Sequence, residues 1–261
     1  MQVLKVILRF WATNLSGELA FRWQWISQVF SGIMMTALNL FIFFVIYSHT
    51  ETIAGWGPWE VVLLVGFTQI CHGVLTLFAA TGIYDLQNLV DSGGLDGILV
   101  RPMNSQVAVS FRSPNIFGMQ EIVLGFLTVV FACGKLEFTP SITGIFLSLL
   151  CLSAAVTAMY AIWFMSMTIT IWFKRLWSWA NLIPNFIDFA RFPREVFDLR
   201  VQLFFRFVIP VILVANVPVE ALRGTIVWHE LGVVFVTAGA LLLASIAFWK
   251  YALCHYSSAS S

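Results

Sequence analysis

Long apolar stretches constrain this chain more than any other feature. A helix of about 20 apolar residues crosses the roughly 30 Å hydrocarbon core of a bilayer. Charged residues make up 10% of the chain, whereas a soluble domain carries about 25%. We therefore predict an all-α integral membrane protein with six transmembrane helices, forming one domain over residues 1–261. The predicted spans lie near residues 25–47, 59–80, 115–133, 142–173, 201–215 and 227–249.

Two of these spans have unusual lengths. The fourth is too long for one straight crossing, so we expect it to tilt or to project beyond the bilayer. The fifth is short and contains Pro210, and Pro218 follows soon after it. Proline lacks a backbone donor, and free backbone groups cannot face lipid. We therefore expect the fifth span to be a bent or broken helix packed inside the protein.

The first 20 residues have an amphipathic pattern. Lys5, Arg9 and several uncharged polar residues recur at helical spacing, and apolar residues fill the opposite face. Such a helix suits the membrane interface better than the bilayer centre. We expect an interfacial helix here; the alternative is an ordinary extension of the first span.

The basic residues predict an orientation. Cytoplasmic segments of membrane proteins carry an excess of lysine and arginine. If the N-terminus is cytoplasmic, 12 of the 14 basic residues fall inside, and only Lys135 and Arg223 fall outside. Both termini are then cytoplasmic, as are two loops at residues 81–114 and 174–200. The net charge of +1 provides no basic face for nucleic acid.

The loop at residues 81–114 carries the densest pattern of polar residues. It holds three acids within twelve residues, namely Asp85, Asp91 and Asp96. A short helix is expected at residues 83–90. Gly93 and Gly94 follow it, and glycine accepts the left-handed conformation that ends a helix.

No motif in the sequence supports catalysis on this chain. A phosphate-binding loop requires GxxxxGK[ST] and a zinc protease requires HExxH, and neither occurs. We therefore expect no enzyme, no metal site and no cofactor held by this chain. His72 and Glu121 are ionisable residues within predicted spans, which makes them functional candidates. The alternatives are a hydrogen bond to a neighbouring helix for His72 and an ion pair with an inner arginine for Glu121.

Two further motifs stand between the predicted spans. The first is Ser92-Gly93-Gly94-Leu95, followed by Leu99-Val100-Arg101-Pro102-Met103-Asn104. The second is Phe192-Pro193-Arg194-Glu195-Val196-Phe197, then Ile209-Pro210 and Val217-Pro218, ending at Ala221-Leu222-Arg223-Gly224. In their order and spacing against six spans, these motifs resemble the membrane subunit of an ABC-2 type export permease. The resemblance extends over essentially the whole chain.

The resemblance implies both partners and a location. Such a permease works with a second permease subunit, identical or paralogous, and with two separate ATPase subunits that bind ATP and magnesium. It lies in the bacterial cytoplasmic (inner) membrane. The loop between spans two and three supplies a coupling helix that seats in the ATPase, here near residues 83–100. The implied coupling residues are Asp85, Leu86, Leu89, Asp91, Gly93, Gly94, Leu95, Asp96, Leu99, Arg101 and Pro102.

The same resemblance places the substrate path between spans one, two and five. Aromatic residues would line it, although contact with lipid is an equally open role for them. A path without fixed charges indicates a hydrophobic, amphipathic or cationic aromatic cargo. Basic residues of the second loop would bind membrane lipid or brace the ATPase, although the bias of cytoplasmic loops toward basic residues alone would explain them. The implied path residues are Met34, Phe41, Phe44, Phe67, His72, Phe78 and Glu121, and the motif around helix five contributes Phe192, Pro193, Pro210 and Pro218.

Two other functions remain open from the sequence. An ion-driven secondary transporter requires buried carboxylates and often contains inverted repeats. A membrane assembly protein without transport activity has the same hydropathy but no motor. A bound ATPase subunit would separate both from an export permease.

Overall fold

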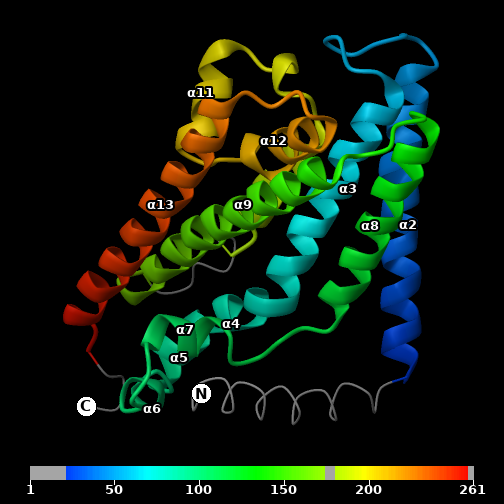
Figure 1. Ribbon diagram of the computed structural model, residues 1–261. Coiled ribbons are helices and arrows are strands. Elements are labelled where there is room, and N and C mark those ends of the chain that lie inside the picture. Colours follow the sequence, from blue (N-terminus) through cyan, green and yellow to red (C-terminus); the bar gives the residue numbers. More distant parts are fainter. Residues whose placement is uncertain (1–21, 174–179, 258–261) are drawn as a thin grey trace.

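The computed structural model describes residues 22–173 and 180–257, so the predicted interfacial helix at residues 1–20 lies outside it. The described residues form helices joined by loops, without a β-sheet (Figure 1). Five helical stretches are long and apolar enough to cross a membrane. They contain α2 (Arg22–Tyr47), α3 (Pro58–Leu75), α8 (Phe117–Lys135), α9 (Ile142–Thr168) and α13 (Trp228–Cys254).

Shorter helices extend and connect these spans. α3 continues through the π-helix η1 (Thr76–Ala80) into α4 (Thr81–Tyr84) and α5 (Leu86–Ser92). α9 continues similarly into the 3₁₀-helix η2 (Ile169–Ile171). The other short helices are α6 (Asp96–Leu99), α7 (Ser105–Ser110), α10 (Leu182–Ile187), η4 (Asp188–Arg191), η5 (Arg194–Val196), α11 (Leu199–Phe207) and α12 (Ile212–Arg223).

The bundle has two recognisable ends. α2, α3 and α8 stand side by side, while α9 crosses the molecule obliquely between α3 and α13 (Figure 1). The helices α4 to α7 form one end, which we call the loop end. The first described residue of α2 and the last of α13 also lie there. The connections α2–α3 and α8–α9 form the opposite end.

Glycines let α3 and α8 pack backbone against backbone. Gly66 and Gly73 on α3 are seven residues apart, as are Gly118 and Gly125 on α8. A Cβ on Gly73 would lie 2.8 Å from the carbonyl oxygen of Gly118, and one on Gly125 would lie 2.8 Å from that of Gly66. Small residues with this role are common between membrane helices, where close packing replaces the hydrophobic effect as the driving force.

The segment 181–196 crosses the depth of the bundle as a series of short helices. At the loop end, the Tyr84 hydroxyl donates to Asn181 Oδ1. Midway, Arg191 donates to Asn39 on α2. At the opposite end, Trp56 Nε1 donates to Glu195 Oε2 at 3.0 Å. The crossing predicted at residues 201–215 is therefore made some 20 residues earlier in the chain.

Residues 201–215 instead belong to a re-entrant excursion. α11 and α12 meet at an angle of 93°, and Pro210 stands in the break between them, as the sequence predicts. Arg206 of α11 pairs with Glu230 at the start of α13. Arg223 at the end of α12 pairs with Glu60 at the start of α3. The excursion thus begins and ends opposite the loop end. Taken together, the two helices are long and apolar enough for one broken span, as predicted, whereas the two ion pairs favour a re-entrant loop.

This path also corrects the predicted distribution of charge. Arg194, Arg200 and Arg206 were assigned to the loop side but lie on elements at the opposite end. Among the described residues, the basic ones toward the loop end are then Arg22, Arg101, Arg112 and Lys250, and those toward the opposite end are Lys135, Arg194, Arg200, Arg206 and Arg223. Arg191 lies within the bundle. Arg194 and Arg206 are paired with the carboxylates of Glu220 and Glu230, and a count of basic residues alone takes no account of such pairs.

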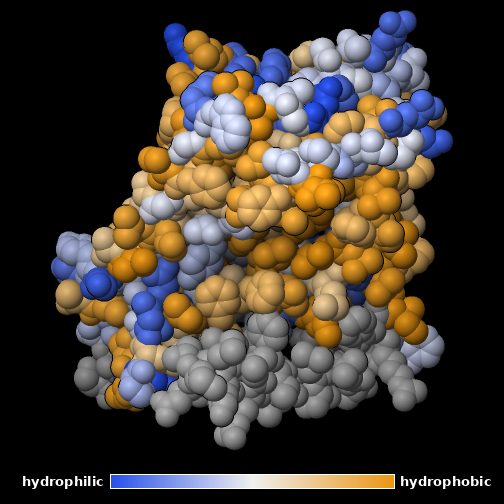
Figure 2. Space-filling view, in the orientation of Figure 1, coloured by the Kyte–Doolittle hydropathy of each residue, from blue (hydrophilic) through white to orange (hydrophobic). Residues whose placement is uncertain are grey.

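The surface matches a protein embedded in a bilayer. Apolar side chains cover the middle of the visible face, and hydrophilic ones gather beside α11 and the α2–α3 connection (Figure 2). α2 is the most exposed of the candidate spans, with Phe41 and Phe44 among its exposed residues. Such a surface is stable only in contact with lipid or another membrane subunit.

Candidate functional site

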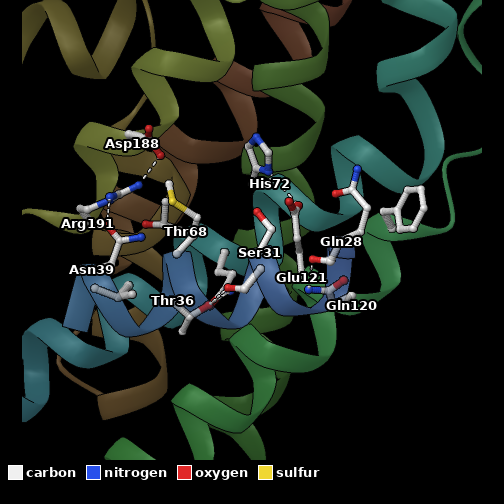
Figure 3. A pocket seen from close by; sticks show the side chains of 15 residues that line it. Gln28, Ser31, Thr36, Asn39, Thr68, His72, Gln120, Glu121, Asp188 and Arg191 are labelled. Atoms are coloured by element: carbon white, nitrogen blue, oxygen red, sulfur yellow. Dashed lines mark hydrogen bonds and ion pairs between the residues drawn. The ribbon is translucent and has the colours of Figure 1, made fainter. Parts of the chain in front are cut away.

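A polar pocket lies between α2, α3, α8 and η4, within the depth of the apolar bundle (Figure 3). Its volume is about 320 Å³, which falls in the range of small-molecule sites. Polar or ionisable groups are costly at this depth and are retained there for function. Its polar lining residues are Gln28, Ser31, Thr36, Asn39, Thr68, Gln69, His72, Gln120, Glu121, Asp188 and Arg191.

Arg191 links the segment 181–196 to α2 at one side of the pocket. Its guanidinium donates to Asp188 and to the side-chain oxygen of Asn39. The 3₁₀-helix η4 holds Asp188 and Arg191 three residues apart, so both side chains point to one face. Two donors of the guanidinium thus find acceptors inside the bundle.

His72 and Glu121 form a second ionisable pair at the other side. His72 Nδ1 lies 2.8 Å from Glu121 Oε2, which links α3 to α8. His72 therefore forms the hydrogen bond to a neighbouring helix that the sequence offered as its alternative role. The partner of Glu121 is this histidine and not an arginine. The glycine contacts at Gly73 and Gly118 bring the two helices close enough for this bond.

Two glutamines of the pocket donate hydrogen bonds within the protein. Gln69 Nε2 donates to Thr36 Oγ1 at 2.7 Å. Gln120 Nε2 donates to the backbone oxygens of Gln28 and Val29. These bonds hold the polar side of α2 against α3 and α8, although α2 buries little apolar surface.

Only two of the implied path residues line this pocket, namely His72 and Glu121. Met34, Phe41 and Phe44 are exposed on α2, and Phe67 is buried in the core. Phe78 lines a different cavity, between α3, α9 and α13. A path without fixed charges does not describe a pocket that contains Asp188 and Arg191.

The motif around Phe192 and Pro193 is the turn that ends the fifth crossing. Phe192 packs its ring 5.4 Å from that of Phe43 on α2. Asn216, at the centre of buried α12, accepts from the Arg194 backbone N–H and donates to the Phe192 carbonyl oxygen. One side chain thus satisfies two backbone groups beside Pro193. Pro218 lies inside α12, one turn from Arg223.

The loop 81–114 folds into a compact segment made of α4 to α7. α5 ends at Gly93, whose φ of 73° confirms the predicted left-handed cap. Asp85 pairs with Arg112 and also accepts from Asn88. Burial lowers the pKa of Arg112 from its ordinary value. This ion pair closes the segment onto itself at its base.

The segment has a buried side and an exposed tip. Leu86, Leu89 and Leu95 are buried against the bundle. Gly93, Asp96 and Leu99 are half-buried, like Asp85. The residues presented at the tip are Asn88, Asp91, Ser92, Gly94, Gly97, Val100, Arg101 and Pro102. Val100 is 83% exposed at this tip.

The sequence reasoning missed Asn39, Asp188, Arg191 and Gln69 as members of the pocket. Asp188 and Arg191 were placed in a cytoplasmic loop, because charges near Phe192 and Pro193 indicate a loop. One signal was available: Asn39 and Gln69 are amides inside otherwise apolar spans, and such residues often bond neighbouring helices.

Comparison with known proteins identifies the family. The model of the family described as ABC-2 family transporter protein matches residues 33–260, which is most of the chain. Comparisons with curated proteins and with solved structures find no match. The matched region contains four of the five candidate spans in full, the helices α4 to α7, and 12 of the 15 residues that line the pocket. The chain therefore belongs to the ABC-2 transporter family and is a membrane-spanning protein of that family.

Proposed function

We propose that this chain is the permease subunit of an ATP-driven exporter. Two permease subunits, identical or paralogous, form the path, and two separate ATPase subunits bind ATP and magnesium. The loop end faces the cytoplasm of a bacterial inner membrane, and both termini lie on that side. Nucleotide-driven closure of the ATPases moves the loop ends and favours one of two permease conformations, which requires different contacts with each conformation.

The exposed tip of the segment α4–α7 is the observation that carries this proposal. A segment that transmits motion from an ATPase to the permease must be rigid and must present a contact surface. The buried leucines and the Asp85–Arg112 pair provide the rigidity. Val100, Asp91 and Arg101 provide an apolar centre with charges beside it. Asp85 belongs to the internal bracing, so we assign contact with the ATPase to Asp91 rather than to Asp85.

Association with an ATPase tests the proposal directly. The tagged chain is purified from its native membrane in mild detergent, as wild type and as the double variant Asp91→Arg/Val100→Asp. We expect an ATPase subunit to accompany the wild type. It should be depleted about tenfold or more in the variant, because a charge reversal and a buried charge oppose the same contact.

Glu51→Arg is the matched control, since Glu51 is exposed at the opposite end of the bundle. It reverses a charge without touching the tip and should retain the ATPase. Recovery of equal ATPase with wild type and with the tip variant would reject the tip as the coupling surface. Absence of any ATPase from the wild type would reject the exporter.

We place the translocation path at the polar pocket rather than along the exposed phenylalanines of α2. Single cysteines at Ser31 and at Phe44 test this, in a background in which Cys71, Cys133, Cys151 and Cys254 are replaced by serine. Only a thiolate reacts with a charged thiol reagent, and thiolates form in water rather than in lipid. We expect Ser31→Cys to react on the order of tenfold faster than Phe44→Cys in membranes. Faster labelling at Phe44 would place the aqueous path on the aromatic face instead.

An ion-driven secondary transporter is the second candidate, favoured by the His72–Glu121 pair in the bilayer-spanning region. The two functions differ in their energy source. Transport by reconstituted permease and ATPase should stop without ATP and continue when the proton gradient is collapsed. The reverse dependence would favour the ion-driven transporter.

A further inference from the structure

A second cavity, separate from the polar pocket, lies between α3, α7, α9 and α13. Its volume is about 390 Å³. Val74 and Phe78 form one wall, and Val156, Leu242 and Ile246 form the others. These five side chains are all half-exposed, so the cavity opens onto the membrane-facing surface.

Most polar groups of this cavity gather at the loop end; the exception is Thr157, whose hydroxyl donates to the Ser153 backbone oxygen of its own helix. Gln106 belongs to α7, and Asn104 is the residue before that helix. The Tyr160 hydroxyl hydrogen-bonds Ser110 of α7 at 2.8 Å. The apolar walls continue away from that end. Leu242 lies 14 residues into α13, about 21 Å from its start, and therefore near the middle of the bilayer. The cavity is thus polar toward the membrane surface and apolar toward the membrane centre.

Gln106 contains an acceptor that lacks a partner. Its side chain is 4% exposed, and its Nε2 donates to Ser245 Oγ at 3.0 Å. Its Oε1 has no hydrogen-bond partner. A buried acceptor left unpaired is costly, and native structures usually satisfy such groups. A donor held in the cavity that Gln106 lines would satisfy this acceptor.

We propose that this cavity binds a phospholipid of the adjacent leaflet, with one acyl chain between α9 and α13 and a donor of its headgroup on Gln106 Oε1. A lipid in that leaflet has the same polarity gradient as the cavity. Lys250 is exposed one helical turn beyond Ile246, on the way to the headgroup level, where an ammonium favours a phosphate. Phosphatidylethanolamine carries the required N–H donors, and phosphatidylcholine does not.

The proposal also explains an irregular helix. Phe78 and Ala79 line the cavity from η1, a π-helix that interrupts the long helix beginning at Pro58. Such π-helical insertions are frequent at functional sites. α7 in turn packs against α4 and α6. A lipid bound here therefore contacts the segment that forms the tip, and this site does not depend on what the tip binds.

Native mass spectrometry of the delipidated chain tests the proposal, with phosphatidylethanolamine and phosphatidylcholine of identical acyl chains. The wild type should prefer phosphatidylethanolamine by about tenfold, the effect of one hydrogen bond from a charged donor. Val156→Trp fills the cavity and should weaken binding of both lipids by about tenfold or more. Gln106→Met removes the acceptor, keeps the length of the side chain and should abolish the preference between the two lipids.

Val123→Trp is the matched control, because Val123 is exposed on α8 and does not line the cavity. It should bind as the wild type does. If Val156→Trp does not fold, Ile246→Trp fills the same space from α13. Undiminished binding in a folded cavity-filling variant would overturn the site. Equal binding of the two lipids by the wild type would overturn the assignment of the headgroup donor.

Discussion

Arg194→Met should destabilise the protein by about 3 kcal/mol, the low end of the cost of removing one partner from a buried ion pair. Arg194 pairs with Glu220 at 3.1 Å and with Glu195 at 3.0 Å. Without the guanidinium, the half-buried Glu220 loses its ion-pair partner. Thermal unfolding in detergent measures the loss.

Two further variants separate charge from packing at this site. Arg194→Met/Glu220→Gln removes both members of the pair and should recover much of the loss, because no buried charge is then left unpaired. Arg194→Lys keeps the charge but loses the planar guanidinium with its several donors, so its stability should lie between that of the wild type and that of Arg194→Met. If the double variant is as unstable as the sum of its single variants, the cost lies in packing and the ion-pair explanation is wrong.

Gly73→Ala should destabilise the protein by about 1–3 kcal/mol, although it adds a single methyl group. Its Cβ would meet the Gly118 carbonyl oxygen and the Ile122 backbone nitrogen at 2.8 Å each. These are backbone atoms, so α3 and α8 must separate to admit it. The separation would also lengthen the His72–Glu121 bond, and we expect transport activity to fall further than the lost stability alone explains.

Gly239→Ala is the matched control, because nothing lies within 4 Å of a Cβ at that position on α13. Alanine is favoured over glycine in a helix by up to about 1 kcal/mol, so this variant should be neutral or slightly stabilising. Opposite signs for the two variants in one thermal-unfolding series would support the close approach of α3 and α8. A loss of stability at Gly239 as large as that at Gly73 would contradict it.

Much of the architecture could be read from local sequence. The apolar runs predict an all-helical membrane protein, because hydropathy over about 20 residues reports a span without knowledge of its neighbours. Gly93 predicts the end of α5 for a similar reason, since its left-handed backbone is a local property. His72 and Glu121 were identified one at a time as ionisable residues within spans, but their pairing was not.

The fifth crossing could not be read in the same way. The segment 181–196 is short, broken and charged, so its composition resembles that of a loop. It can lie inside the bundle because its polar groups have partners there. Asn39 and Asp188 accept from the Arg191 side chain, and Asn216 accepts from the Arg194 backbone N–H. The apolar residues 201–215 look like a span by composition. The ion pairs of Arg206 and Arg223, however, hold the beginning of α11 and α12 and their end on the same side of the bundle, opposite the loop end.

The sequence by itself therefore determined the class of fold and the family resemblance, which depend on local composition and spacing. Of the eight residues at the exposed tip it singled out four, namely Asp91, Gly94, Arg101 and Pro102, and it missed Val100. Only the tertiary structure decided which charged residues lie inside the bundle and which helices enclose the two cavities. The physical reason is that a charge within a membrane protein is stable only where its partners are, and those partners come from helices distant in the chain. Arg191 and Asn39 are 152 residues apart, and His72 and Glu121 are 49 apart.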